Sequence, residues 1–187
     1  MKITKLGHCC LIIEIKGKRF LTDPGAYTTE QNDVKNIDCV IISHEHTDHL
    51  HIESLKTVLQ NNPQAQVISN SSVGKILEKE GISYIKISDG EQFKMGEVEI
   101  SGHGVKHAPI YKDYEQVENT GYFFDKKLFY PGDAFYNPNL PVDILAFPVS
   151  APWCKISESI DYMLDVKPRI AFPVHDGMLV EGRIGSV

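Results

Sequence analysis

The sequence contains no apolar run near the roughly 20 residues that a membrane-spanning helix requires. Its four cysteines form no C-x-x-C pair, and two of them, Cys9 and Cys10, are adjacent, so reduced thiols are expected. The N-terminal segment has an apolar centre, but it carries His8 and Glu14 and lacks a small-residue cleavage site, unlike a signal peptide. We therefore expect a cytoplasmic protein with no membrane partner.

Positive charge is also scarce. Nineteen Lys and Arg residues against 25 Asp and Glu residues give a formal net charge of -6 at pH 7. Such a chain repels long polyanions unless basic residues are concentrated locally, and the sequence contains no basic arm. We expect no nucleic-acid partner and a small-molecule substrate, while the oligomeric state stays open.

Few prolines and glycines, 10 and 14 in 187 residues, and a hydrophobic fraction of 42% are typical of a globular chain. This length suits one domain, residues 1–187, without a linker or internal repeat. Apolar and β-branched runs predict strands at residues 3–6, 11–16, 19–22, 39–43, 67–69, 82–87, 98–100, 121–124, 128–130, 143–149 and 169–174. Helical patterns occur at residues 53–60, 72–80 and 157–166, the last from the spacing of Ile160, Met163 and Leu164. Helices between groups of strands indicate a mixed α+β fold.

Four of the eight histidines fall within residues 44–51, in the string SHEHTDHLH. In an extended segment, His44 and His46 project to the same side because side chains alternate with a period of two. Asp48 and His49 follow where the chain turns toward the next helix, so they can face a neighbouring point. The spacing predicts two adjacent metal ions. His51 lies beyond the pattern and is interpreted as a surface residue or a partner of a ligand.

This string resembles the H-x-H-x-D-H motif of the metallo-β-lactamase superfamily, and the short chain resembles the small metal-dependent hydrolases grouped with ascorbate-6-phosphate lactonase. The resemblance implies an αββα sandwich in a single domain. It also implies three further ligands, each after a strand: a histidine in EISGHGVKHAPI, an aspartate in FYPGDAF and a histidine in AFPVHDG. For the first, His107 fits better than His103; the others are Asp133 and His175. Asp23, in FLTDPG, is expected to orient a ligand histidine.

The resemblance implies one metal held by His44, His46 and His107, a second held by Asp48, His49 and His175, and Asp133 between them. Nitrogen and oxygen donors suit zinc, but also manganese or iron. None of the cysteines matches a ligand position. His8, in LGHCC, is expected to line a pocket or to lie in the core, without a metal role.

Two adjacent divalent metals favour hydrolysis by metal-bound hydroxide, with Asp48 and Asp133 orienting the attacking water and accepting its proton. The substrate is expected to be a small ester, lactone or phosphodiester. Common zinc β-lactamases carry arginine and cysteine where this chain has His49 and Asp133, which disfavours antibiotic hydrolysis. A mononuclear-iron sulfur dioxygenase or another oxidoreductase of the same fold, and a noncatalytic metal-binding module, are the alternatives. Trp153 is expected to lie in the core or at the rim of a pocket. The segment 108–119 is expected to form either a pocket wall or a solvated loop.

Overall fold

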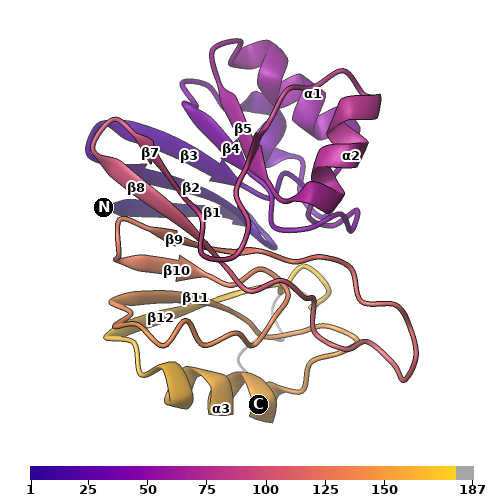
Figure 1. The fold of residues 1–187 in the computed structure, drawn as a ribbon, viewed down its shortest axis with the longest axis vertical. Helices are drawn as coiled ribbons and strands as arrows, with labels where there is room; N and C mark the ends of the chain where they lie inside the picture. The colour runs from indigo at the N-terminus through magenta and orange to yellow at the C-terminus, as the bar shows by residue number, and fades with distance from the viewer. Residues whose placement is uncertain (180–187) are drawn as a thin grey trace.

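The computed structural model describes residues 1–179, which form two six-stranded sheets packed face to face between helices (Figure 1). The first sheet contains, in spatial order, β1 (Lys2–Gly7), β2 (Cys10–Ile15), β3 (Lys18–Thr22), β4 (Cys39–Ile41), β5 (Gln66–Ser69) and β6 (Ile85–Lys86). The second contains β12 (Ile170–Val174), β11 (Ile144–Pro148), β10 (Leu128–Tyr130), β9 (Gly121–Phe124), β8 (Val98–His103) and β7 (Gln92–Met95). The predicted αββα arrangement is confirmed.

Helices α1 (Ile52–Asn61) and α2 (Ser71–Lys79) cover the outer face of the first sheet, and α3 (Ile156–Val166) covers the second (Figure 1). A short 3-10 helix, η1 (Glu30–Asp33), follows β3 and was not predicted. Within residues 1–179, no helix combines the length and the apolar character needed to cross a membrane.

Strand β2 shows how the sequence builds the layers. Leu11 and Ile13 point between the two sheets, whereas Cys10 and Ile12 point toward α1 and α2, as the period of two requires. Both faces are therefore buried, which explains an apolar run in place of polar alternation. The hairpin from β2 to β3 turns at Lys16 and Gly17, both with positive φ, as a tight two-residue turn requires.

The helical pattern near the C-terminus located α3, but two of the apolar residues that carry the pattern are exposed. Ile160 and Leu164 are 45% and 60% exposed, whereas Tyr162 and Val166 pack against the second sheet. On this buried side the Tyr162 hydroxyl also donates to the carbonyl of Tyr136 at 2.8 Å. The apolar spacing thus located the helix but not its buried side.

Other differences concern strand length. The expected strand 39–43 ends at Ile41, and the expected strand 82–87 shrinks to the two residues of β6. Strand β7 was missed because its polar residues alternate with only two apolar ones, Phe93 and Met95. These strands are short or lie at a sheet edge, where sequence patterns are weakest.

Six strands end shortly before five of the predicted site residues and His8. Within the first sheet β1, β3 and β4 run in the same direction, and within the second β8, β10 and β12 do so. The loops that leave parallel strands at their carboxyl ends gather at one edge of a sheet. His8, Asp23 and His44 follow the first three strands, and His107, Asp133 and His175 follow the other three.

Candidate metal centre

The structure brings together the first predicted metal group. One potential ligand atom from each of His44, His46 and His107 lies within 4.8 Å of the other two. Nε2 of His44 is 3.1 Å from Nδ1 of His46, and the Ser43 hydroxyl lies 3.0 Å from Nδ1 of His44. Burial lowers the pKa of His44 and of His46, so their neutral, ligating forms are favoured.

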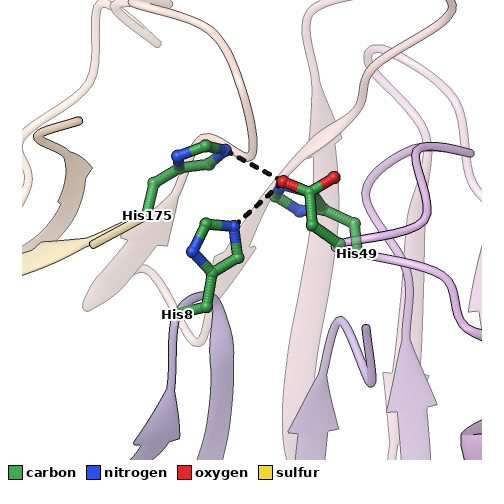
Figure 2. A group of neighbouring side chains, drawn as sticks. His8, His49 and His175 are labelled. Carbon is green, nitrogen blue, oxygen red and sulfur yellow. Dashed lines mark hydrogen bonds and ion pairs between the residues drawn. The ribbon is translucent and has the colours of Figure 1, made fainter. Parts of the chain in front are cut away.

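The second predicted group is also assembled, and a fourth side chain lies beside it. Ligand atoms of Asp48, His49 and His175 lie within 4.8 Å of one another, together with an atom of His8. The rings of His8, His49 and His175 converge from three segments far apart in the sequence (Figure 2). Oδ2 of Asp48 lies 3.4 Å from Nε2 of His175 and 3.7 Å from Nε2 of His49.

Asp133 lies between the two groups. Its Oδ1 is 3.1 Å from Nε2 of His49, and its Oδ2 is 2.9 Å from Nε2 of His175 and 3.4 Å from Nε2 of His107. The preceding Gly132 has φ +62°, and a Cβ there would lie 2.8 Å from the Cβ of Ser43. Glycine is therefore needed for the chain to deliver this carboxylate against the first sheet.

The Nδ1 atoms of two histidines are anchored to backbone carbonyls. Nδ1 of His107 donates to the carbonyl of Ala108, and Nδ1 of His175 donates to the carbonyl of Ser150, both at 2.6 Å. In the neutral tautomer this leaves the lone pair on Nε2, which faces the centre of the cluster. Metal-binding histidines commonly have this arrangement, in which an outer hydrogen bond fixes the ring.

Asp23 orients the ring of His49 in the same way. Its Oδ2 lies 2.7 Å from Nδ1 of His49, and both side chains are fully buried. The carboxylate is held by the backbone N–H of Ser43 at 2.7 Å, by the Ser43 hydroxyl at 2.6 Å and by the Tyr130 hydroxyl. The sequence predicts that Asp23 orients a ligand histidine. The roles of Ser43 and Tyr130 could not be predicted, because they depend on contacts distant in sequence.

Four buried polar atoms at the centre have no hydrogen-bond partner among residues 1–179: Nε2 of His49, His107 and His175, and Oδ1 of Asp133. Their close approaches to one another lack hydrogen-bond geometry, although burying unpaired polar atoms is costly. Three imidazole nitrogens and a carboxylate oxygen that converge in this way fit divalent metal ions with nitrogen and oxygen ligands, which bind the deprotonated imidazoles. The donor set is compatible with zinc, manganese or iron.

The electrostatics of the centre are those of closely packed ion pairs. Burial alone would lower the pKa of His175, but Asp133 and Asp48 outweigh it and raise this pKa to about 9. Burial likewise opposes ionisation of Asp133, yet His49, His107 and His175 hold its pKa well below the usual range. Protons therefore occupy part of the cluster in the metal-free protein, and cations compete with them.

Three other residues considered from the sequence lie outside the cluster or do not ligate. His103 contacts Ser101 at 2.9 Å and packs against Phe123 and Phe129, away from the metal groups. His51 is the N-cap of α1, where its side chain accepts from the N–H of Ser54. Cys9 lies near the cluster, but burial raises the pKa of its thiol, and a protonated thiol is a poor ligand.

A cavity of about 440 Å³ opens onto both groups. Its wall includes the aromatic rings of Tyr27 and Trp153 and the carboxylate of Glu45, and among the described residues that line it there is no Lys or Arg. Trp153 thus lies at the pocket and not in the core. In the segment 108–119, Ile110 lines the cavity, whereas Tyr111 is largely exposed, so the segment is partly wall and partly solvated.

Comparisons with known proteins cover almost the whole chain. A sequence model described as "Beta-lactamase superfamily domain" matches residues 2–175. Protein Rv0786c of Mycobacterium tuberculosis is 33% identical over 184 residues, 96% of this chain and 85% of the relative. A UPF0173 metal-dependent hydrolase of Carboxydothermus hydrogenoformans is 26% identical over 193 residues, 94% and 84% of the two chains. The solved structure of Igni18, a metallo hydrolase of Ignicoccus hospitalis, is 20% identical with a TM-score of 0.74 over 92% of this chain and 81% of that chain.

Proposed function

The chain belongs to the metallo-β-lactamase superfamily as a metal-dependent hydrolase, and we propose that it uses a dinuclear centre to cleave a small ester, lactone or phosphodiester. The observation that carries the proposal is the convergence of three unpaired Nε2 atoms and one unpaired carboxylate oxygen. We assign the ligands as two groups: His44, His46 and His107; and Asp48, His49 and His175. Asp133, whose carboxylate contacts His49, His107 and His175, would be shared between them.

Two divalent cations, when bound at such a centre, would lower the pKa of bound water, polarise the electrophile and stabilise the leaving oxygen. Zinc is the proposed metal because imidazole and carboxylate are its usual ligands; manganese and iron remain compatible with the same donor set.

The two aspartates, Asp48 and Asp133, have different proposed roles. The Asp133 side chain is only 3% exposed and contacts histidines of both groups, which suits it to hold them together. The Asp48 side chain is 18% exposed and lines the cavity, so a water molecule and a substrate can reach it. We assign Asp48 to orienting the attacking water and accepting its proton.

The surroundings support a small substrate. Tyr27, Trp153 and Ile110 offer apolar contact at the cavity, while Glu45 repels additional anionic groups. A substrate without charges beyond the reacting group fits this wall best. Nucleic acids are poor candidates because the net charge of the chain is -6.

The test is a panel of lactones, aryl esters and phosphodiesters assayed with the metal-loaded protein. Cleavage that disappears on chelation, returns with zinc or manganese and is lost in Asp48→Asn supports the proposal. His103→Gln is the matched control and is expected to retain activity. Absence of all cleavage, together with oxygen consumption in the presence of a persulfide, would replace the hydrolase with an iron dioxygenase.

A further inference from the structure

His8 is buried at the edge of the cluster, yet it belongs to neither proposed metal group. It follows β1, has φ +51° and is 2% exposed. Its ring lies 4.1 Å from the ring of His175 between centroids, and its Nε2 is 3.1 Å from Oδ2 of Asp48 (Figure 2). Distance alone therefore permits two roles, a fourth ligand or a hydrogen-bond partner of Asp48.

The other ring nitrogen decides between these roles. Nδ1 of His8 receives a hydrogen bond from the backbone N–H of Gly177 at 3.1 Å. A backbone N–H can only donate, so Nδ1 must carry the lone pair and the ring proton must be on Nε2. The ionised carboxylate of Asp48 can only accept, which requires the same tautomer. A protonated Nε2 has no lone pair for a metal.

The backbone of His8 also holds the segment that carries His175. The carbonyl of His8 accepts from the N–H of His175 at 3.3 Å. Nearby, Lys5 donates to the carbonyl of Pro173 at 3.0 Å and forms an ion pair with Asp176. Residues at the end of β1 thus bind the backbone or side chains on both sides of His175. The imidazole of His8 contacts Asp48 at the same time.

We propose that His8 is a positioning residue that donates from Nε2 to Asp48 and fixes this carboxylate relative to His175, without binding metal itself. The inference rests on the proposed dinuclear site. An oxygen of Asp48 that accepts one hydrogen bond from His8 keeps a second lone pair for a cation. His8 therefore sets the direction in which Asp48 faces the second metal group.

Two substitutions separate the two hydrogen bonds of the ring. In His8→Gln the side-chain amide N–H takes a position close to Nε2, so the donor to Asp48 is kept. In His8→Asn the amide oxygen takes a position close to Nδ1, so only the acceptor for Gly177 is kept. His8→Ala removes both, and His103→Gln is the control for replacing a half-buried histidine outside the cluster.

The first measurement is metal affinity of the full chain, by competition with a chromophoric chelator. We expect His8→Ala and His8→Asn to weaken binding of the second equivalent by about 10- to 100-fold, with His8→Gln closer to the wild type and the first equivalent unchanged. The absorption spectrum of the cobalt-loaded protein should be the same in all variants at saturation. Rescue by Asn instead of Gln, wild-type affinity in all three variants, or a changed cobalt spectrum would each overturn the inference.

The second measurement needs neither metal nor substrate. Long-range ¹H–¹⁵N NMR of the metal-free chain, assigned with His8→Gln, should show the His8 proton on Nε2. A proton on Nδ1 would overturn the positioning role. A wild-type protein that binds two metals but cleaves nothing would refute the proposed hydrolysis and leave the role of His8 intact. A wild-type protein without a second metal would refute both.

Discussion

Nδ1 of His49 lies 2.7 Å from Oδ2 of Asp23, and neither side chain touches solvent. The contact fixes the imidazole so that Nε2 points to Asp133, 3.1 Å away. Asp23 itself has φ +36°, a backbone conformation that non-glycine residues seldom adopt. A buried carboxylate, on a residue with an unfavourable backbone conformation, thus supports a histidine at the centre of the cluster.

Replacing Asp23 with Asn should weaken metal binding without removing a proposed ligand. The amide cannot hold the same set of donors, so the ring of His49 is free to rotate, and affinity should fall about 10- to 100-fold. Chelator competition measures this fall. Tyr130→Phe is the control, because it removes one donor to Asp23 and leaves the contact with His49; its affinity should change much less. Equal affinities in wild type and Asp23→Asn would reduce Asp23 to a turn residue.

The saturated wild-type protein should contain two divalent metals per chain. Elemental analysis after removal of loosely bound metal gives the number. His46→Ala should empty mainly the first group and His175→Ala mainly the second, while His103→Ala should retain both metals. At most one tightly held metal in the wild type would rule out the dinuclear centre, and metal loss in His103→Ala would show that the choice of His107 is wrong.

Stability of the metal-free protein should depend on pH through His175. Because its pKa is raised from 6.5 to about 9, its contribution is fully present below pH 6.5 and is lost as the pH rises through 9. The loss is on the order of 3 kcal/mol, from about 1.4 kcal/mol per unit. Urea unfolding between pH 6 and 9.5 measures it. His175→Gln should flatten the decline and His103→Gln should not; an unchanged slope in His175→Gln contradicts the assignment.

Gly25→Ala should disturb the site, although Gly25 has no side chain and is not a proposed ligand. A Cβ at Gly25 would lie 1.7 Å from the backbone oxygen of Asp48, so the two segments must move apart. We expect a destabilisation of about 1–3 kcal/mol, the usual cost of overpacking, and weaker binding of the second metal. Gly17→Ala is a useful control, since no atom of residues 1–179 would lie within 4 Å of a Cβ at that position and only its positive φ opposes the change. Metal affinity should be preserved there.

Trp153→Ala should raise KM for substrates with an apolar group and leave kcat nearly unchanged. The indole lies 5.6 Å from the ring of His107 and 6.0 Å from that of His175, at the wall shared by both groups. A tenfold rise corresponds to about 1.4 kcal/mol of lost binding. Steady-state kinetics with an acetyl ester and a longer acyl ester of the same alcohol separates the effects. Identical losses for both esters would mean that Trp153 supports the site and does not contact substrate.

The sequence predicted the helices and strands, and the residues that cluster, best where these residues stand in one short string or directly follow an apolar strand. His44, His46, Asp48 and His49 stand in one short string, and Asp133 and His175 each follow an apolar strand, so local spacing was informative. The contact of His8 with Asp48 was out of reach because it joins two loops 40 residues apart.

The buried side of α3 was equally out of reach. The spacing of Ile160, Met163 and Leu164 located the helix, but the side chains that pack against the second sheet include Tyr162 and Val166. The buried side of the helix depends on the sheet residues against which it packs, and these are distant in sequence.

The proposed ligands are divided between the two sheets. His44, His46, Asp48 and His49 leave the first sheet, whereas His107, Asp133 and His175 leave the second, so each proposed metal group draws on both. A cation held in this way would link the two halves of the chain. The complete ligand set exists only when the two sheets are packed together. Metal binding would therefore raise the free energy of unfolding. Metal supply would thereby raise the equilibrium stability of the fold as well as support its chemistry.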